Sequence, residues 1–358
     1  MTKPDKTSEP VRWGIVGTGT MAEQFAEDLS VSDGAVFSAV SSRNAARAKA
    51  FGARHGSHAS AHASYADLLA NRELDAIYVA TPNDTHFAVA CAAIESGKGV
   101  LVEKPLVATS LEAARLAALA AERGVFLMEA MWTRFLPAIS KAKTLIEDGA
   151  IGEIQRLRGQ LAFDHPYDPE SRFYSKERGG GAMHDLGVYC VSLARFFMGE
   201  PIEFSGEWRA APTGVDRAAS LTLRFRNDVV AHLSCAFDHE GDNSFIIEGS
   251  RGTLVLPAPF IAARDVLQCS SGFAARLATI PGRSAPARAI RKLISRLPVP
   301  GIRKHGFPYD GHGLQFEIEA ASGAIRSGRT HHPTMHPLDS TRTLEIIETV
   351  LKEDNRRP

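Results

Sequence analysis

The sequence predicts an α/β plus α+β protein in which a doubly wound parallel sheet precedes a largely antiparallel open sheet. Two observations carry this prediction. Apolar runs alternate with helical patterns through the first third of the chain, which favours βαβ units. After about residue 150, strand-like segments follow one another closely with few helices between them. Because 358 residues suit two cores better than one, we expect domains at 1–128 and 129–358.

The elements of the first domain follow in order. A strand at Val11–Val16 leads into a glycine turn, a helix at 21–29 and a second strand at 36–40. The run at 75–80 is continuously apolar, as in a strand that is buried on both faces. The remaining predicted strands lie at 99–102 and 125–128, and the remaining helices at 43–53, 85–96 and 111–123.

The second domain is predicted from strand-like segments at 154–163, 220–225, 229–237 and 243–248, with helices at 181–197, 313–327 and 340–352. Residues 261–305 are strongly basic, with Asp265 as the only acid. Within that stretch, residues 287–297 have the pattern of a short basic amphipathic helix. We interpret the stretch as a solvated surface insertion, with a site for an anion, a membrane surface or a partner as the alternative.

The overall composition excludes several classes of function. Lys plus Arg equal Asp plus Glu at 41 each, so no global field attracts nucleic acid or a membrane. Residues 1–10 are polar and lack the apolar core of a signal peptide, so we expect a cytoplasmic protein with reduced thiols. His331, His332 and His336 lie close together, but prolines interrupt the run, and we expect no metal site.

A nucleotide fingerprint follows the first strand. Gly17 permits a tight turn, Gly19 lets the backbone approach a pyrophosphate, and Ala22 allows the helix to pack closely on the strand. The start of that helix offers free N–H groups and the positive end of its dipole to the phosphates. This strand–turn–helix context predicts a Rossmann domain, with a cofactor contacted by Gly17, Thr18, Gly19, Thr20 and Met21.

The choice of cofactor depends on the end of the second strand. An NAD enzyme usually places a carboxylate there for the ribose 2′-hydroxyl, whereas this chain has Ser42 and Arg43. Hydroxyl and guanidinium groups bind a 2′-phosphate. We therefore expect NADP, with NAD as a second acceptable cofactor. The alternative is that Ser42 caps the next helix and Arg43 is merely exposed.

Further motifs carry a family resemblance. They are Thr81-Pro82-Asn83-Asp84-Thr85-His86, Glu103-Lys104-Pro105 and Gly179-Gly180-Gly181-Ala182-Met183-His184-Asp185-Leu186-Gly187-Val188-Tyr189. Together with the glycine fingerprint, they resemble the glucose–fructose oxidoreductase/inositol dehydrogenase (Gfo/Idh/MocA) superfamily over nearly the whole chain. The segment at 128–137 and the tyrosine at position 189 resemble the branch of dimeric dihydrodiol dehydrogenase and NADP-dependent D-xylose dehydrogenases. The resemblance implies a homodimer or higher homo-oligomer.

The resemblance also implies the catalytic residues. Tyr189 takes the acid–base position, and Lys104 is the lysine of the motif. A tyrosine has an ordinary pKa of about 10, and a nearby ammonium group lowers it, which makes the phenol useful for proton transfer. Asp185 precedes Tyr189 by four residues, so both would lie on one helix face. Each motif taken alone is also compatible with a simple turn, a surface charge or a buried aromatic residue.

The remaining site residues complete the prediction. On the cofactor side we place Thr81, Pro82, Asn83, His86, Glu103 and Lys104. By resemblance to the same branch, Trp132, Arg134 and Phe135 would form a pocket wall, because an aromatic face suits the apolar side of a ring. Arg172 would reach substrate hydroxyls, although a surface ion pair also accounts for it.

The expected function follows from these assignments. The chain would be a metal-independent NADP dehydrogenase that acts on a cyclic sugar, at C1 of an aldose, or on a trans-dihydrodiol. Two alternatives remain open: a non-catalytic nucleotide- or sugar-sensing regulator on the same fold, and a lyase or glycosidase that uses tightly bound NAD. The retention of Lys104, Asp185 and Tyr189 argues against a sensor, which needs no proton path.

Overall fold

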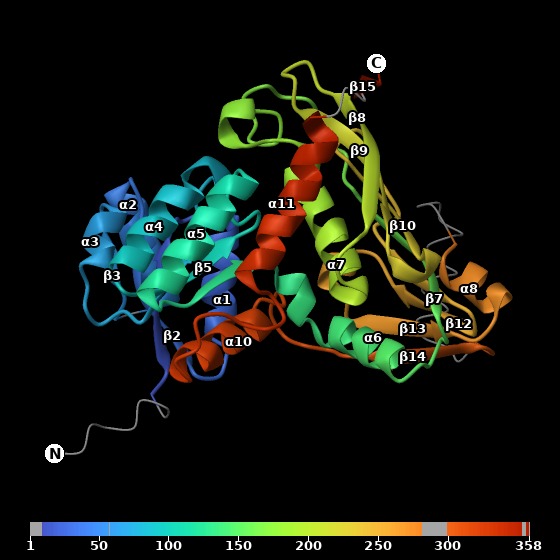
Figure 1. Ribbon diagram of the computed structural model, residues 1–358. Coiled ribbons are helices and arrows are strands. Elements are labelled where there is room, and N and C mark those ends of the chain that lie inside the picture. Colours follow the sequence, from blue (N-terminus) through green and yellow to red (C-terminus); the bar gives the residue numbers. More distant parts are fainter. Residues whose placement is uncertain (1–8, 57, 281–298, 353–355, 358) are drawn as a thin grey trace. The chain divides into compact units, whose positions relative to one another are not determined.

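The computed structural model describes residues 9–56, 58–280, 299–352 and 356–357, which Figure 1 shows as coloured ribbons. The polar segment 1–8 and the amphipathic helix predicted at 287–297 lie outside the described residues. The described chain divides into two compact units. The first unit comprises residues up to Trp132 together with Asp310–Glu345, and the second comprises Thr133–Tyr309 and the residues from Ile346 onward.

The first unit contains a six-stranded sheet in which all neighbouring strands are parallel. Its order is β3-β2-β1-β4-β5-β6, so the direction of winding reverses between β1 and β4. Ligands bind to doubly wound sheets at such a reversal, outside the carboxyl ends of the strands. The predicted doubly wound sheet is confirmed. Its strands are β1 (Val11–Val16), β2 (Ala35–Ser41), β3 (Ser60–His62), β4 (Ala76–Val79), β5 (Gly99–Glu103) and β6 (Leu127–Ala130).

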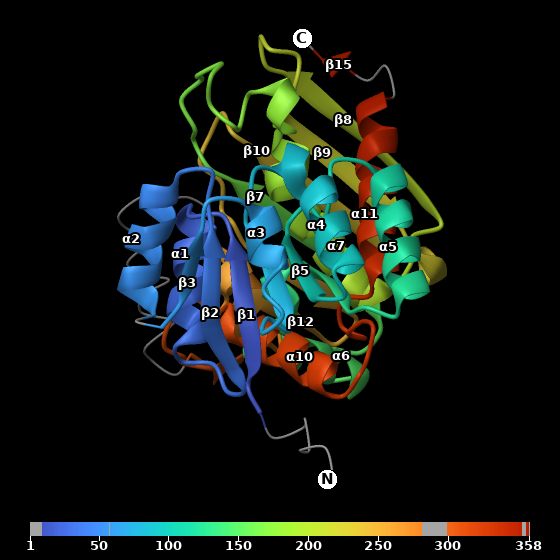
Figure 2. The same ribbon diagram turned by 90° about the vertical axis from the view of Figure 1, so that its left-hand side faces the viewer.

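Helices cover both faces of this sheet. One buried apolar cluster joins the strands to α3, α4 and α5, and Figure 2 shows α4 and α5 side by side. On the other face, Phe25 of α1 stacks on Tyr78 of β4, and Trp13 of β1 donates a hydrogen bond to Ser322 of α10. The helices of the first unit are α1 (Thr20–Leu29), α2 (Ala45–His55), α3 (Tyr65–Leu69), α4 (His86–Glu95), α5 (Ser110–Arg123) and α10 (Gln315–Arg326).

Residues Asp310–Glu345 return to the first unit, which a division of the chain at residue 128 does not include. Asp28 of α1 is fully buried, and its carboxylate accepts hydrogen bonds from the backbone N–H groups of Gly313 and Leu314 at 2.9 and 2.7 Å. These contacts fix the segment that leads into α10. The next helix, α11 (Pro337–Lys352), contributes residues to both units. The pairing of distant segments has no local signature, so the sequence pattern could not show it.

The second unit contains a nine-stranded sheet within the described residues, in the order β14-β13-β12-β11-β7-β10-β9-β8-β15. Its pairs are antiparallel except β7 with β10 and β8 with β15, so the largely antiparallel sheet is confirmed. The strands are β7 (Ile154–Ala162), β8 (Glu203–Ala210), β9 (Asp216–Arg224), β10 (Val230–Ala236), β11 (Phe245–Gly249), β12 (Gly252–Leu256), β13 (Asp265–Cys269), β14 (Ile302–Gly306) and β15 (Arg356–Arg357).

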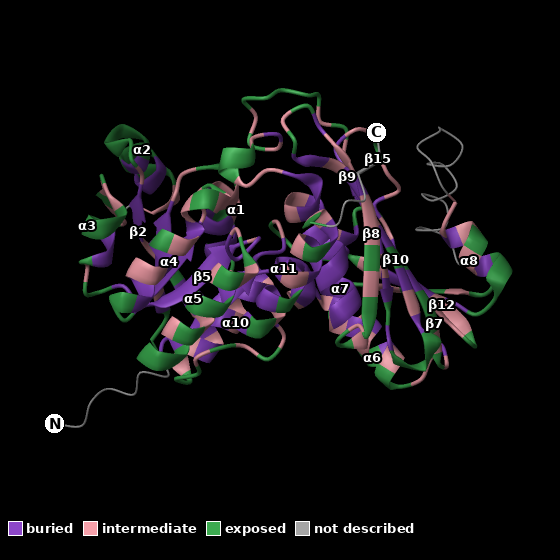
Figure 3. Ribbon diagram, turned by 45° about the horizontal axis from the view of Figure 1, so that its top comes forward, coloured by how far each residue is buried: buried purple, intermediate pink, exposed green. Residues whose placement is uncertain are grey.

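Burial alternates along the strands of this sheet. In β7, Leu157 and Leu161 are buried while Arg156 and Arg158 are exposed, which is the period of two expected for a sheet covered on one face. Helix α7 (Val188–Met198) contacts β7 and β10, and Figure 3 colours it as buried over most of its length. Helix α6 (Pro137–Glu147) and helix α8 (Gly272–Ala278) both contact β12, β13 and β14.

The basic stretch at 261–305 is not a simple insertion where the structure describes it. Strands β13 and β14 pair with each other over five residues, and α8 between them contributes Ala274 and Ala278 to a buried cluster. The interpretation as a surface insertion therefore needs correction for these residues. In β14, Arg303 and Lys304 concealed the strand, because an edge strand tolerates charged side chains.

Candidate functional site

The glycine turn between β1 and α1 has the geometry of a phosphate-binding loop. Gly17 has φ +119°, and a Cβ built on it would lie 2.4 Å from the carbonyl oxygen of Ala80, so only glycine fits. The Gly17 N–H donates to the carbonyl of Ser41, which joins the turn to the end of β2. The turn is thus held between the carboxyl ends of β2 and β4.

Gly19 has a different environment. It is the exposed N-cap of α1, and a Cβ built on it would meet nothing within 4 Å. No side chain caps this helix. The open space and the uncapped first turn fit the pyrophosphate of a dinucleotide, which would lie against backbone N–H groups at the positive end of the dipole. Thr18 is half-buried, Thr20 is exposed and Met21 is half-buried around the same turn.

The end of β2 presents hydroxyl and guanidinium groups without a carboxylate. Asn44 caps α2 by accepting a hydrogen bond from the N–H of Arg47, so Ser42 is not the helix cap. The Ser42 hydroxyl accepts from the N–H of Asn44 at 3.3 Å, and Arg43 is exposed. The hydroxyl of Ser41 is buried without a hydrogen-bond partner. Among these residues, Ser42 and Arg43 would hold the adenosine end of the cofactor.

The segment after β4 forms a tight turn, η1 (Asn83–Thr85), before α4. The Thr85 hydroxyl donates to the carbonyl of Pro82 and is hydrogen-bonded to the hydroxyl of Thr81, each at 2.7 Å. Pro82 is exposed and Asn83 half-buried, so both can be reached from the carboxyl edge of the sheet. These contacts give the turn a fixed shape beside the glycine loop.

His86 lies beneath this turn and is fully buried. Its Nδ1 lies 2.9 Å from the carbonyl oxygen of Pro105, and its Nε2 lies 2.9 Å from that of Thr81. Burial lowers the pKa of His86, although the contacts with the two carbonyl oxygens raise it in part. The imidazole therefore ties the turn after β4 to the loop after β5. The predicted contact of His86 with the cofactor stays a prediction.

The Glu103-Lys104-Pro105 motif leaves the carboxyl end of β5. The hydroxyl of Tyr78 donates to Oε1 of Glu103, and the N–H of Lys104 donates to its Oε2. Burial raises the pKa of Glu103, and the hydrogen bond from Tyr78 lowers it in part. The Lys104–Pro105 peptide bond is cis, and Lys104 is half-buried. Glu103 thus anchors the backbone that carries Lys104.

Sequence reasoning missed Tyr78, which belongs to this anchor, and a buried acid near it. Tyr78 is the residue of β4 that carries a hydroxyl group, and a hydroxyl in a strand buried on both faces was the available signal. Glu317 of α10 is fully buried, and neither of its carboxyl oxygens has a hydrogen-bond partner. Burial raises the pKa of Glu317 well above its usual value, and nearby Glu103, Asp28 and Glu129 raise it further. No local pattern predicts such a cluster of buried acids.

In the second unit, Asp185 lies on a π-helical turn, η4 (Met183–Gly187), and Tyr189 on the first turn of α7. The helix predicted at 181–197 thus begins with a π-helical turn that continues into α7, and π-helical turns are frequent at functional sites. Nη1 of Arg172 lies 3.4 Å from Oδ1 of Asp185, and its guanidinium covers the ring of Phe173. Arg172 is exposed, while Tyr189 is only 5% exposed.

The predicted wall residues lie on or near a short turn, η2 (Trp132–Phe135). Trp132 is largely buried and Phe135 half-buried. Arg134 is buried, and it donates from Nε to the hydroxyl and from Nη2 to the carbonyl of Ser192, each at 2.8 Å. Its guanidinium also lies over the ring of Phe196. Arg134 therefore holds η2 against α7, and its part in a substrate pocket stays a prediction.

The structure brings the cofactor-side residues together at the carboxyl edge of the first sheet. The turns after β1, β2, β4 and β5 carry them, and hydrogen bonds link neighbouring turns. Separately, the second unit brings Arg172 to Asp185, four residues before Tyr189. Lys104 belongs to the first unit and Tyr189 to the second, so their cooperation stays a prediction.

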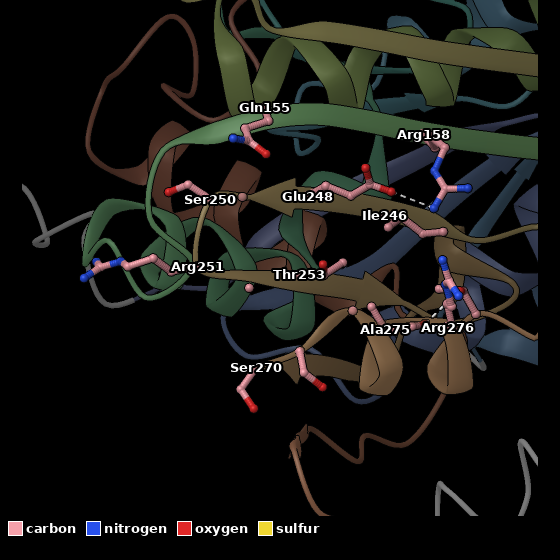
Figure 4. A pocket seen from close by; sticks show the side chains of 15 residues that line it. Gln155, Arg158, Ile246, Glu248, Ser250, Arg251, Thr253, Ser270, Ala275 and Arg276 are labelled. Atoms are coloured by element: carbon pink, nitrogen blue, oxygen red, sulfur yellow. Dashed lines mark hydrogen bonds and ion pairs between the residues drawn. The ribbon is translucent and has the colours of Figure 1, made fainter.

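A separate hollow of about 750 Å³ lies in the second unit and is lined by none of these motif residues. Figure 4 shows Arg158 paired with Glu248 there, beside Ser250, Arg251 and Arg276. Several of its polar groups already serve the fold. The hydroxyl of Ser250 accepts from the backbone of Glu153, and Arg251 donates to the carbonyl of Gly149. The hollow therefore does not compete with the motif residues as a candidate active site.

Two further kinds of site are absent from the described residues. No group of three or more His, Cys, Asp and Glu side chains among them could hold a metal ion. The rings of His331 and His336 lie 4.3 Å apart, and the Nδ1 of His332 accepts from the N–H of Thr334. None of the helices in the described ranges combines the length and the apolar character needed to cross a bilayer.

Comparison with known proteins shows which family this chain matches. Residues 11–131 match the model of an oxidoreductase family with an NAD-binding Rossmann fold, and residues 139–255 match the GFO/IDH/MocA C-terminal domain. The chain is 33% identical over 347 residues to trans-1,2-dihydrobenzene-1,2-diol dehydrogenase of Danio rerio, with 96% of each chain covered. The Homo sapiens enzyme of that name is 26% identical over 347 residues, with the same coverage.

Solved structures agree with this assignment. KijD10, a 3-ketoreductase from Actinomadura kijaniata solved with NADP and TDP-benzene, is 26% identical with a TM-score of 0.79. The match covers 96% of this chain and 97% of that one. The resemblance drawn from the glycine fingerprint and the Glu-Lys-Pro and triple-glycine motifs is confirmed. The chain belongs to the GFO/IDH/MocA family of oxidoreductases.

Proposed function

We propose that this protein is an NADP-dependent dehydrogenase that acts on a CH–OH group of a cyclic sugar or of a trans-dihydrodiol. The observation that carries the proposal is the carboxyl edge of the first sheet. There an open, uncapped glycine turn stands beside Ser42 and Arg43, where an NAD enzyme usually has a carboxylate. Relatives named as dihydrodiol dehydrogenases and a 3-ketoreductase solved with NADP support the substrate class and the cofactor.

The residues of this chain would divide the work as follows. Backbone N–H groups at the start of α1 bind the pyrophosphate, and Arg43 with Ser42 binds the 2′-phosphate. When bound, NADP supplies the nicotinamide that takes a hydride from the alcohol carbon. The phenolic oxygen of Tyr189 takes the hydroxyl proton, and the carbonyl product forms as the C–H and O–H bonds break. The ammonium group of Lys104 stabilises the phenolate.

Asp185 and Arg172 would place the substrate. The 3.4 Å contact between them holds the carboxylate in the segment that leads to Tyr189. A carboxylate accepts hydrogen bonds from ring hydroxyls, and a guanidinium donates to them. The indole of Trp132 would cover the apolar face of the ring. With an aldose as substrate, oxidation at C1 gives a lactone. In the opposite direction, the same groups would reduce a carbonyl.

The first test is a screen for NADPH formation with aldoses, inositols and trans-dihydrodiols, with NAD in parallel. We expect turnover of an aldose or a trans-dihydrodiol, with NADP preferred. Tight binding of nucleotide without turnover of any substrate would contradict the proposal and favour the sensing regulator. Turnover that needs no added nucleotide would favour an enzyme with tightly bound cofactor.

Replacement of the acid–base residue tests the mechanism. We expect Tyr189→Phe to keep the fold and cofactor affinity and to lower kcat by about 10²–10⁴, because general acid–base groups contribute that much. Tyr65→Phe is the matched control, since Tyr65 is exposed on α3 of the first unit. Turnover by Tyr189→Phe at the rate of the control would show that another residue transfers the proton.

Replacement of Arg43 tests the cofactor assignment. The exposed guanidinium would lose its ion pair with the 2′-phosphate, so Arg43→Ala should raise the KM for NADP by about tenfold or more. The KM for NAD should change little, because NAD lacks that phosphate. Arg115→Ala, on α5, is the control for loss of a surface charge. Equal losses with both cofactors would contradict the assignment.

A further inference from the structure

The first residue of β9, Asp216, carries a buried carboxylate that the proposed chemistry does not use. The residue is 3% exposed, and its Oδ2 accepts a hydrogen bond of 2.6 Å from the N–H of Met183. Met183 is the first residue of the π-helical turn η4, which carries Asp185. The carboxylate thus holds the start of the segment on which two predicted catalytic residues lie.

Of the glycines before η4, Gly181 lies directly against this carboxylate. Gly181 has φ +122°, and a Cβ built on it would lie 2.2 Å from Oδ1 of Asp216. Gly180 is equally confined, because its Cβ would lie 2.7 Å from the carbonyl oxygen of Phe173. A side chain at position 181 would force the loop away from β9, whereas one at position 180 would collide with the preceding turn of the same loop. Gly181 therefore allows the backbone to reach the carboxylate.

The backbone connects this contact directly to the predicted catalytic residues. The N–H of Asp185 donates to the carbonyl of Gly181 at 3.1 Å, so a displacement of Gly181 moves Asp185. The π-helical turn runs without a break into α7, whose second residue is Tyr189. At the far end of the turn, a Cβ on Gly187 would lie 3.1 Å from Sγ of Cys235. The turn is thus confined at both ends by the sheet.

The charge at Asp216 has little solvent to stabilise it. Burial raises its pKa to about 7, although hydrogen bonds from the backbone of Met183 and Ala182 lower it in part. The neighbouring titratable group is the buried thiol of Cys235, whose pKa burial also raises. Burial of a carboxyl group is costly unless hydrogen bonds compensate for the lost solvent. The hydrogen bonds from the loop to Asp216 therefore offset the cost of its burial.

We propose that Asp216 is a positioning residue that holds the loop at Gly181–Met183 and thereby places Asp185 and Tyr189 for proton transfer. The proposal rests on the proposed function for its catalytic consequence only. The structural part, that the carboxylate orders the π-helical turn, stands without any substrate. The two parts can therefore be tested by separate measurements on the full chain.

Hydrogen exchange followed by mass spectrometry tests the structural part. In Asp216→Ala, the backbone N–H groups of peptides that cover Met183 and Asp185 should exchange about tenfold faster or more, because a hydrogen bond to a charged group is lost. Asp265→Ala is the matched control, since Asp265 is also the first residue of a strand of the same sheet. Equal exchange in these peptides for Asp216→Ala and the control would overturn the proposal.

Asp216→Asn tests whether the hydrogen-bond acceptors of Asp216 matter, because asparagine keeps a side chain of the same size. Its amide oxygen can still accept from Met183 while the second acceptor is lost, so exchange should rise only about threefold. This partial rescue relative to Asp216→Ala is required by the proposal. If the alanine variant does not fold, the asparagine variant decides alone, and unchanged exchange in the segment would overturn the proposal.

Kinetics test the catalytic part. With a substrate found in the screen, Asp216→Ala should lower kcat by about 10²-fold, the effect of a displacement of about 1 Å in a reacting group. The KM for NADP should stay the same, because the cofactor residues lie in the first unit. Loss of kcat in Asp216→Ala without faster exchange would overturn the proposal. Faster exchange in a chain whose wild type turns over no substrate supports the structural part and overturns only the proposed function.

A double variant tests the contact itself. Gly181→Ala drives a methyl group against the carboxylate, and Asp216→Ala removes that obstacle. The loss of Tm in the double variant should therefore be smaller than the sum of the two single losses, since residues in contact are not additive. Strain from the positive φ of Gly181 remains in both backgrounds and cancels in the comparison. Additive losses would contradict the close contact on which the proposal depends.

Discussion

The two glycine-rich segments of this protein contain glycine for opposite reasons. In the first unit, a Cβ on Gly19 would point into open space, and the backbone there is extended in a way that any residue adopts. In the second unit, a Cβ on Gly180 or Gly181 would collide with atoms of the protein itself. The comparison teaches that a glycine in open space leaves room for a ligand to approach the backbone, whereas a crowded glycine is required by internal packing.

Gly17 is crowded and also belongs to the predicted pyrophosphate turn, so its replacement should show the largest effect. Its φ of +119° and the 2.4 Å approach to the carbonyl of Ala80 leave no room for a side chain. We expect Gly17→Ala to lower the free energy of unfolding by about 2–4 kcal/mol and to abolish NADP binding. Urea unfolding and a fluorescence titration with NADPH measure the two losses. Retention of nucleotide affinity would show that this turn is not the pyrophosphate site.

Gly180 belongs to the crowded class, and its replacement should affect stability alone. Three backbone carbonyl oxygens lie within 2.8 Å of the position of its Cβ. We expect Gly180→Ala to lower the free energy of unfolding by about 1–3 kcal/mol, as overpacking does, with the Kd for NADPH unchanged. The same unfolding and titration experiments check this. Weaker NADPH binding with normal stability would break the comparison between the two segments.

Gly19 belongs to the open class, and its replacement should affect binding alone. We expect Gly19→Ala to raise the Kd for NADPH by about tenfold or more, because the methyl group occupies the place of the pyrophosphate. Stability should change by less than about 0.5 kcal/mol. Gly124→Ala is the reciprocal control. That residue ends α5 at φ 62° in open space, so its replacement should cost about 1 kcal/mol of stability and leave Kd unchanged.

A Gly19→Ala variant that binds NADPH normally would contradict the placement of the pyrophosphate at this turn. It would mean that open space beside a helix start does not mark a ligand site in this chain. The cofactor residues would then have to be sought elsewhere along the carboxyl edge, beginning with the turn after β4. Gly17→Ala and Gly19→Ala should also be titrated with NADH alongside NADPH. Weaker binding of both nucleotides would indicate loss of the contact with the pyrophosphate, which they share, and weaker binding of NADPH alone would indicate loss of the contact with the 2′-phosphate.

Local signals in the sequence were sufficient for five of the six strands of the first sheet and for its glycine turn. Strand β1 has the limits that the sequence predicts, Val11–Val16, because an apolar run that ends in a glycine turn is typical of the first strand of a Rossmann domain. Helix α5 was predicted at 111–123, and the structure shows that Thr109 and Glu112 form a capping box at its start and that Gly124 lies at its end. Strand β3 was missed, since three residues at a sheet edge leave no period to detect.

The sequence by itself determined the two-sheet architecture, the family and the residue types that suit hydride chemistry, because periodicity and short motifs are local properties of a chain. Only the tertiary structure decided that residues 310–345 return to the first unit, that Arg134 binds Ser192, and that Asp216 lies against Gly181. Each of these depends on segments far apart in the chain. Buried polar groups must find partners when the chain folds, and where they find them is set by packing and not by sequence distance.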